Sequence, residues 1–152
     1  MVTVGKRIAN FKLPATGDKN LTRDDFKGKK LILYFYPKDH TPGCTRESQD
    51  FRDAQARFNS AGAVVVGVSR DSVKTHENFR AKQTLPFDLI SDADETLCQA
   101  FDVIREKSLY GRKYMGVDRS TFLIDEEGVL RAEWRGVRVP GHVEEVLQAL
   151  DA

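Results

Sequence analysis

Residues 31–36 are apolar without interruption, and residues 63–69 are predominantly apolar. A strand that is covered on both faces has this pattern, because neither set of its alternating side chains meets water. We therefore expect both stretches to be buried strands at the centre of a sheet, with other elements packed on both sides.

Shorter segments predict further elements around this centre. Residues 11–13 alternate like a short strand and lead into a turn over residues 16–20. Residues 22–26 predict a short helical turn, and residues 87–90 predict a third strand.

The second half of the chain contains a predicted hairpin. Residues 120–124 and 129–134 are strand-like and flank the polar run 125–128, which suits a reversal of the chain. Residues 105–118 are rich in Gly, Lys and Tyr and are expected to form a loop.

Four segments are expected to be helical. Three of them are residues 42–58, 94–101 and 141–150. The fourth begins after a cap at Asp71 or Ser72 and runs to about residue 83. Strands and helices alternate before the hairpin and the closing helix, which predicts an α/β fold in layers. No repeat, low-complexity segment or linker divides the sequence, so one domain over residues 1–152 is expected.

Composition and charge narrow the class of protein. The 152 residues are 40% hydrophobic and 31% charged, with a formal net charge of +1. These values are typical of a soluble globular domain with a sizeable core. Lys and Arg alternate with Asp and Glu, so neither nucleic acid nor a membrane surface is an expected partner. Residues 1–15 lack the apolar core of a secretory signal, and a cytoplasmic location is expected.

The chain contains only two cysteines, Cys44 and Cys98, and no CxxC pair. This usage is typical of a reducing compartment and does not predict a structural zinc site. The histidines, His40, His76 and His142, are far apart in the sequence and are expected at the surface.

The segment 37–44, PKDHTPGC, carries the candidate chemistry, because it joins the apolar run to the predicted helix 42–58. Thr41 suits the N-cap, Pro42 the first helical position and Cys44 the third. Backbone N–H groups without partners and the positive end of the helix dipole favour a thiolate there. The alternative is a buried, inert cysteine. A reactive cysteine is favoured, because a strand and a Thr-Pro-Gly turn precede Cys44 and place it in the first turn of the helix.

Helical spacing from Cys44 places Ser48, Phe51, Gln55 and Phe58 on the same side of the helix. Cys44 therefore begins the stripe that faces the core. We expect it in a recessed and largely apolar pocket that is open to polar donors at the helix end.

Pro37, Thr41 and Cys44 match the Pro-xxx-Thr-xx-Cys active-site pattern of the peroxiredoxins. The wider strings YFYPKD and TPGCT, followed by Glu47, resemble the bacterioferritin comigratory protein branch, also called the Q type. Residues 87–92 and 119–125 resemble segments of the same branch, so the resemblance covers nearly the whole chain.

This resemblance implies a thioredoxin-like α/β fold, with a central mixed β-sheet flanked by helices and an N-terminal β extension. It implies a thiol-dependent peroxidase that reduces hydrogen peroxide and small organic hydroperoxides in antioxidant defence. The cysteine becomes a sulfenic acid, and thioredoxin or a small thiol regenerates it. No metal, haem or nicotinamide is required. A monomer is expected, with a weak dimer as the alternative.

The resemblance also assigns roles to site residues. Cys44 is the nucleophile, and Arg119 supplies a cation, although from the residues alone Arg119 reads as a surface charge at a strand end. The Thr41 hydroxyl is expected to donate to the sulfur or to a peroxide oxygen. Pro37 shields the pocket from water, and it also suits the end of a strand.

Two further residues belong to the expected site. The backbone N–H groups of Gly43 and Cys44 are candidate donors to the reacting oxygen atoms. Glu47 resembles a position that holds the arginine, and its alternative is a favourable acidic residue in the first helical turn.

Cys98 lies at the margin of an apolar helical face and is expected to be a small core residue. In the resembled branch, a resolving cysteine often lies five residues after the first, where this chain has Gln49, or in the next helix, where it has residues such as Arg80. Cys98 is then the only internal candidate for resolving oxidised Cys44. We expect one essential cysteine and an external thiol.

Two other functions compete with the peroxidase. A thiol–disulfide oxidoreductase needs a second cysteine beside Cys44, and Thr41 occupies that place. A non-enzymatic thioredoxin-like binding or chaperone module predicts a Cys44 of ordinary reactivity. Titration of the thiol with dilute peroxide separates the module from the peroxidase.

Overall fold

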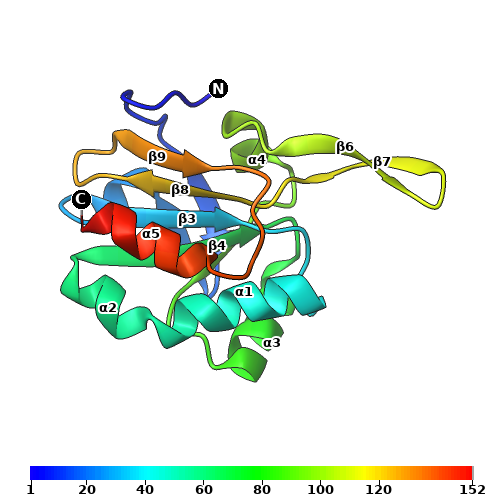
Figure 1. Cartoon of the computed structure of the whole chain (residues 1–152), viewed down its shortest axis with the longest axis horizontal. Coiled ribbons are helices and arrows are strands. Elements are labelled where there is room, and N and C mark those ends of the chain that lie inside the picture. The colour runs from blue at the N-terminus through cyan, green and yellow to red at the C-terminus, as the bar shows by residue number, and fades with distance from the viewer. Residues whose placement is uncertain (152) are drawn as a thin grey trace.

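The computed structural model describes residues 1–151, and a seven-stranded mixed sheet forms their centre (Figure 1). The order of the strands is β2-β1-β5-β4-β3-β8-β9. They span β1 (Lys12–Ala15), β2 (Lys19–Thr22), β3 (Lys30–Phe35), β4 (Ala63–Ser69), β5 (Leu89–Ser91), β8 (Ser120–Ile124) and β9 (Leu130–Trp134). The central strands β3, β4 and β5 are parallel, and β8 runs antiparallel to β3.

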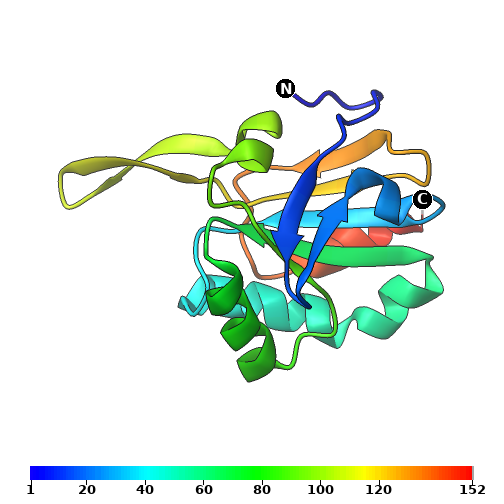
Figure 2. The ribbon, with the colours of Figure 1, turned by 180° about the vertical axis from the view of Figure 1, so that it is seen from behind.

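Helices cover both faces of the sheet (Figures 1 and 2). They are η1 (Arg23–Phe26), α1 (Pro42–Asp53), α2 (Gln55–Ser60), α3 (Val73–Gln83), α4 (Thr96–Ala100) and α5 (His142–Leu150). Buried side chains of α1, α2, α3 and α5 form one hydrophobic core, while α4 and the N-terminal segment contribute to a second. No helix within residues 1–151 has the length and apolar character to cross a membrane.

The alternation of side chains along β3 separates these two cores. Ile32 and Tyr34 point into the core of α1 and α5, whereas Leu31, Leu33 and Phe35 point into the core of α4. Residues 31–36 are thus apolar without interruption because both faces of β3 are buried, as predicted. The thioredoxin-like α/β fold is confirmed, and the antiparallel pair β1–β2 forms its N-terminal β extension.

Several predicted elements are confirmed closely. Strand β4, the β8–β9 hairpin, the helical turn η1 and the closing helix α5 lie where the sequence pattern placed them. The choice between two caps for α3 is settled, because the Ser72 hydroxyl accepts a hydrogen bond from the backbone N–H of Thr75 at 3.2 Å. This bond satisfies one of the free donors of the first helical turn.

Other boundaries differ from the prediction. The expected helix 42–58 is interrupted at Ala54, whose backbone angles are φ −98° and ψ 7°. Phe51 and Phe58 nevertheless remain in one core on either side of the break. The expected turn 16–20 is shorter, because Lys19 already pairs with Ala15 at the start of β2. Helix α4 is shorter as well, and the Asp92 carboxylate accepts hydrogen bonds from its early N–H groups.

The prediction of a loop over residues 105–118 is wrong. Strands β6 (Ile104–Leu109) and β7 (Arg112–Val117) form a separate two-stranded antiparallel sheet. Tyr110 and Gly111 connect them with φ values of 51° and 78°, the backbone that a two-residue hairpin turn requires. Polar side chains occupy both faces of this hairpin, so the sequence lacks the apolar alternation that normally indicates a strand. The hairpin projects from the body of the molecule (Figure 1).

Candidate active site

Cys44 occupies the third position of α1 and is 1% exposed. Thr41 is the N-cap residue in an extended conformation, and Pro42 is the first helical residue. The first backbone bond of the helix runs from the N–H of Thr45 to the carbonyl of Thr41. The N–H groups of Gly43 and Cys44 therefore have no acceptor within the helix, as the sequence predicted.

Arg119 contacts the sulfur directly. Its Nη2 lies 3.4 Å from the Sγ of Cys44, and its Nη1 donates to the Oε1 of Glu47 at 2.7 Å. Arg119 precedes β8, and the pairing of Ser120 with Phe35 places it beside the end of β3. The segment 37–44 leaves β3 at the same end, which brings residues distant in sequence into one site.

Glu47 is fully buried beneath this arginine. Burial raises the pKa of Glu47 to about 7, although the charge of Arg119 and its hydrogen bond oppose the change. Burial alone would lower the pKa of Arg119, but the charges of Glu47 and Cys44 outweigh it and raise that pKa. Arg119 therefore remains a cation beside the sulfur.

Gly43 leaves room for the guanidinium. A Cβ atom at this position would lie 3.1 Å from the Nη2 of Arg119, closer than ordinary van der Waals contact. The sequence identified Gly43 only as a backbone donor. This steric contribution was missed, because it depends on a residue that is distant in the chain.

Thr41 and Pro37 lie in the segment that joins β3 to α1, and both are half-buried. The Thr41 hydroxyl donates to the carbonyl of Lys38 at 2.7 Å, which stabilises the turn before the helix, and not to the sulfur. Its action on a bound peroxide stays a prediction. Pro37 is half-buried and follows the fully buried Tyr36 at the end of the central strand.

The chain resembles known proteins over nearly its whole length. The model of the AhpC/TSA family matches residues 4–133. Peroxiredoxin Bcp of Xanthomonas campestris is 52% identical over 146 residues, which cover 95% of this chain and 91% of that protein. Peroxiredoxin Bcp of Bacillus subtilis is 47% identical over 149 residues, which cover 98% and 95%. The chain belongs to the peroxiredoxin family.

Solved structures agree with this assignment. Peroxiredoxin Q of Xanthomonas campestris has a TM-score of 0.89 at 51% identity, covering 93% of this chain and 89% of that one. A PrxQ mutant of Xylella fastidiosa has a TM-score of 0.94 at 44% identity, covering 99% and 96%. The resemblance to the bacterioferritin comigratory, or Q-type, branch is thereby confirmed. Peroxiredoxins are thiol-dependent peroxidases, so this protein is an oxidoreductase of that class.

A buried network supports the candidate active-site segment of this peroxiredoxin. The carboxylate of Asp39 accepts a hydrogen bond from the Tyr36 hydroxyl at 2.6 Å and lies 2.6 Å from the Nδ1 of His76. The Nε2 of His76 lies 2.9 Å from the carbonyl of Ile90, and the N–H of Asp39 donates to Asp71. Helix α3 and strand β5 are thus tied to the segment that carries Thr41 and Cys44.

Two of the three histidines are not surface residues as predicted. His76 is 0% exposed and His142 is 2% exposed, and only His40 lies at the surface. The Nε2 of His142 lies 2.7 Å from the hydroxyl of Thr121. Burial, assisted by the charge of Arg119, lowers the pKa of His142 to about 4. Each buried histidine bonds to residues distant in sequence, which a linear pattern does not reveal.

The ligand-type atoms of Asp39, Asp71 and His76 lie within 4.8 Å of one another. Both ring nitrogens of His76 are already hydrogen-bonded, to Asp39 and to a backbone carbonyl. The three residues form a closed hydrogen-bond network and not an open set of metal ligands.

Cys98 is a packed core residue, as predicted. It is 0% exposed and belongs to the core of α4, whereas Cys44 belongs to the core on the other face of the sheet. Both cysteines are free thiols. Burial and the neighbouring carboxylate of Asp92 raise the pKa of the Cys98 thiol, so it is a poor nucleophile.

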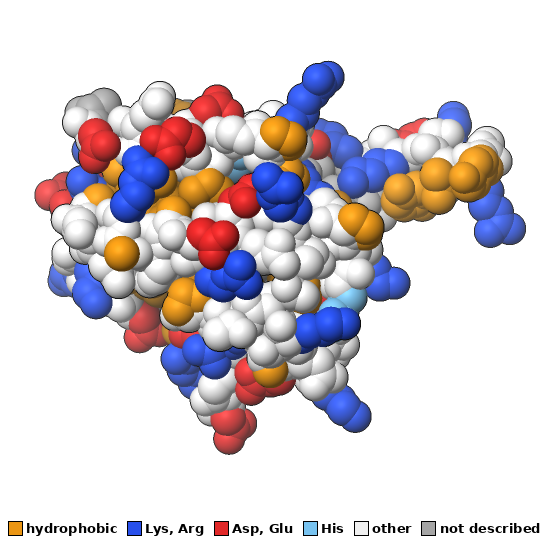
Figure 3. Space-filling model, turned by 60° about the horizontal axis from the view of Figure 1, so that its bottom comes forward, with side chains coloured by type: hydrophobic (Ala, Val, Ile, Leu, Met, Phe, Trp, Pro, Cys, Tyr) orange, Lys and Arg blue, Asp and Glu red, His pale blue; other side chains and the backbone are white. Residues whose placement is uncertain are grey.

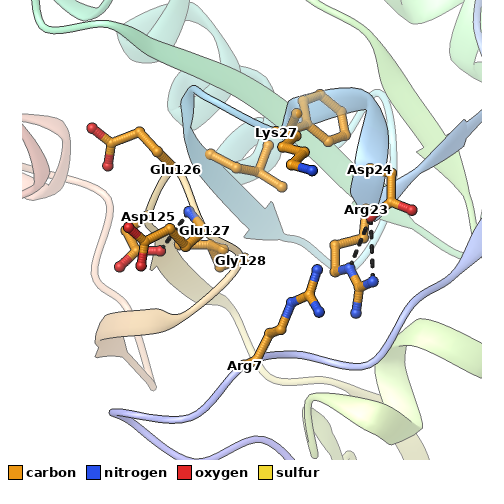
Figure 4. Close-up of a pocket in the computed structure, with 11 residues that line it drawn as sticks. Arg7, Arg23, Asp24, Lys27, Asp125, Glu126, Glu127 and Gly128 are labelled. Atoms are coloured by element: carbon orange, nitrogen blue, oxygen red, sulfur yellow. Dashed lines mark hydrogen bonds and ion pairs between the residues drawn. The ribbon is translucent and has the colours of Figure 1, made fainter.

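A surface pocket lies at the other end of the sheet (Figure 4). Leu31, at the start of β3, and Ile124, at the end of β8, contribute to its lining. Arg23 at its rim bonds to Asp24 and to the carbonyl of Ile8. The candidate site around Cys44 and Arg119 lies at the opposite ends of the same two strands, so this pocket is separate from it.

Proposed function

We propose that Cys44 is the peroxidatic residue, which reduces hydrogen peroxide and small organic hydroperoxides. The observation that carries the proposal is the 3.4 Å contact between Arg119 Nη2 and Cys44 Sγ at the start of α1. A guanidinium against the sulfur, together with unpaired N–H groups of the helix end, favours the thiolate and attracts a polar oxygen substrate.

In the oxidative step, the thiolate of Cys44 attacks one peroxide oxygen and the O–O bond breaks. The other oxygen leaves as hydroxide or alkoxide and takes up a proton. The sulfur is oxidised to a sulfenic acid, and the peroxide is reduced to water or an alcohol. Negative charge moves from the sulfur onto the oxygens, where Arg119 and the N–H groups of Gly43 and Cys44 stabilise it.

The other residues of the site position these groups. Glu47 holds Arg119 through the 2.7 Å ion pair, and Pro37 limits the access of water. The Thr41 hydroxyl, held by the carbonyl of Lys38, offers an oxygen and a dipole at the N-cap of α1. A preorganised site of this kind needs little rearrangement during the reaction.

Regeneration requires a thiol from outside, since Cys98 lies on the far face of the sheet. The external thiolate attacks the sulfenic sulfur, a disulfide forms, and the hydroxide that leaves becomes water. A second thiol then releases Cys44. Thioredoxin or a small thiol fills this role. Two free cysteines suit the cytoplasm, where the chain would act as a single monomeric domain.

Cys44→Ser tests the nucleophile. This variant should fold and lose essentially all peroxide turnover, as followed by consumption of peroxide with dithiothreitol as the reductant. Cys98→Ser is the control and should stay active. Substantial turnover by folded Cys44→Ser would refute the assignment. A wild-type Cys44 that reacts with peroxide no faster than a free thiol would favour the non-enzymatic binding module.

Arg119→Ala tests the cation. Loss of one preorganised donor typically slows a reaction by about 10²–10³-fold, so Cys44 should be oxidised more slowly by that factor. Arg131→Ala removes an exposed arginine that pairs with Asp125, and it should oxidise at the wild-type rate. Stopped-flow measurement of thiol loss compares the two. Equal rates would remove Arg119 from the mechanism.

A further inference from the structure

The β6–β7 hairpin, here called the arm (residues 104–117), extends away from both cores (Figures 1 and 2). An isolated two-stranded hairpin is marginally stable in water, and packing against another surface would stabilise it. Four of the large hydrophobic side chains that are exposed in residues 1–151 lie on the arm: Leu109, Tyr110, Tyr114 and Met115. Figure 3 shows apolar side chains gathered along it, with Lys and Arg side chains at its tip and base.

Cross-strand partners share a face, so the register of the arm defines two different faces. Arg105, Lys107 and Leu109 of β6 lie on the same face as Arg112 and Tyr114 of β7, and these five residues are called the basic face. It combines three cations with two apolar side chains and carries no carboxylate of the arm. Arg105 pairs with Asp102, which precedes the arm, at 3.1 Å, whereas Lys107 and Arg112 form no ion pair within residues 1–151. The uncompensated positive charge of this face therefore comes from Lys107 and Arg112.

The opposite face is different in character. It carries Glu106, Ser108, Lys113 and Met115. The ammonium of Lys113 lies 3.5 Å from the carboxylate of Glu106, so its charge is compensated.

The basic face begins beside the peroxidatic site. Strand β7 ends at Val117, whose carbonyl accepts a hydrogen bond from the Nζ of Lys107 at 2.6 Å, and Arg119 follows two residues later. Burial lowers the pKa of Lys107, and the charges of Asp118, Arg119 and Cys44 also act on it. Lys107 thus lies between the site and the exposed part of the arm.

Gly116 makes this surface continuous. A Cβ atom there would lie 3.1 Å from the Cδ of Lys107 and 3.2 Å from a ring atom of Tyr114. The two side chains therefore pack over the glycine. A basic and apolar surface runs from the site outward to Leu109 and Arg112, which are cross-strand partners next to the turn.

Any protein that reduces oxidised Cys44 must cover the mouth of the site, because Cys98 lies on the other face of the sheet. Resting on the proposed function, we propose that the basic face of the arm is the docking surface for that reductant. The partner is a dithiol protein with acidic side chains around an apolar patch beside its reactive cysteine. A second copy of this chain fits less well, because its own arm carries the same positive charge.

Docking would bring the reactive thiolate of the partner to the sulfenic sulfur of Cys44. The S–S bond forms there, and the oxygen leaves as water after protonation. The second thiol of the partner then attacks the partner's first cysteine sulfur in the mixed disulfide. This attack releases the Cys44 thiolate and leaves the partner with an internal disulfide. Opposite charges at the surface accelerate the encounter, and salt weakens them.

Arg112→Glu and Tyr114→Ser test the docking surface, since both residues are exposed and lie outside the active site. With thioredoxin as the probe, each should lower kcat/KM for the reductant by about tenfold, the effect of losing one good interface contact. With dithiothreitol, turnover and the rate of Cys44 oxidation should equal those of wild type. Lys113→Glu makes a charge change of the same size on the opposite face and should keep kcat/KM near the wild-type value.

Salt provides a second measurement. The wild-type kcat/KM for thioredoxin should fall as ionic strength rises, and Arg112→Glu should show a weaker dependence. A wild-type protein that turns over with dithiothreitol but not with thioredoxin would overturn the docking proposal alone. The same conclusion follows if the arm variants and Lys113→Glu behave alike, if the arm variants alter oxidation by peroxide, or if they change the sedimentation of the protein. A wild type that reduces no peroxide with either reductant would overturn the proposed function itself, and the docking proposal with it.

Discussion

At the scale of single residues, the contact between Arg119 and Cys44 is possible because Gly43 has no side chain. The guanidinium lies 3.4 Å from the sulfur, and a Cβ atom at position 43 would lie 3.1 Å from the same nitrogen. Glu47 holds the other nitrogen of the guanidinium, so the arginine has little freedom to move aside.

Gly43→Ala should therefore slow the oxidation of Cys44 by peroxide. A displacement of about 1 Å at a reacting centre can cost about 10²-fold. The extra methyl group requires Arg119 to move by only a few tenths of an ångström, so the expected loss of rate is smaller than that. Stopped-flow oxidation measures the effect, with Arg46→Ala, an exposed change in the same helix, as the control. A wild-type rate in Gly43→Ala would mean that the arginine retains its position despite the methyl group.

Glu47 should make stability depend on pH. Its pKa in the folded protein is raised to about 7, so between pH 4.5 and 7 the folded state holds a proton that the unfolded state has lost. The stability that this proton contributes is present at low pH and disappears as pH rises through the folded pKa, by about 3 kcal/mol at most.

Denaturant unfolding of wild type and Glu47→Gln at several pH values isolates this contribution. The free energy of unfolding of wild type, minus that of Glu47→Gln, should fall as pH rises from 4.5 to 7. His142 acts in the opposite direction, since its lowered pKa makes stability rise with pH, but it is present in both proteins and cancels. A difference that does not change with pH would show that Glu47 stays ionised.

At the scale of elements, the tight packing of β4 against its neighbours supports the strand that leads to the site. Gly67 of β4 lies between β3 and β5. A Cβ atom there would lie 2.7 Å from the Cδ2 of Leu89 and 2.9 Å from the ring of Tyr34. The hydroxyl of Tyr34 is also hydrogen-bonded to Ser48 of α1, so a displacement of Tyr34 would be transmitted to the helix that carries Cys44.

Gly67→Ala should lower the free energy of unfolding by about 1–3 kcal/mol, the usual cost of an extra methyl group in a packed core. Denaturant titration measures the loss. The double variant with Leu89→Val should lose less than the sum of the two single changes, because the smaller side chain relieves the contact. Strict additivity would show that the contact with Leu89 is not the source of the strain.

At the scale of the whole molecule, the sheet separates the two thiols. Cys44 lies in the core of α1 and α5, and Cys98 lies in the core of α4. A disulfide needs Cα atoms about 4.4–6.8 Å apart, which two residues on opposite faces of a sheet do not reach without unfolding of an element.

Cys98→Ser should therefore turn over peroxide at close to the wild-type rate with the same reductant. Mass spectrometry of wild type after one equivalent of peroxide should find the sulfenic acid, or its trapped adduct, on Cys44. A dominant Cys44–Cys98 disulfide, with turnover lost in Cys98→Ser, would identify Cys98 as the resolving residue and contradict the single-cysteine mechanism.

The sequence by itself determined the parts of this peroxiredoxin that depend on near neighbours in the chain. The buried strands β3 and β4 follow from their predominantly apolar sequences, and the start of α1 follows from Thr41 and Pro42. Periodicity and capping act over a few residues, so these features and the position of Cys44 can be read from the chain alone.

Only the tertiary structure decided which distant residues complete the site. The family resemblance named Arg119, but only the pairing of Phe35 with Ser120 shows how that arginine reaches Cys44. The approach of Arg119 also explains Gly43. The burial of His76 depends on partners in other elements, and the arm forms from strands without an apolar stripe. In each case the deciding contact joins residues far apart in sequence, and it exists only once the strands have paired and the helices have packed on the sheet.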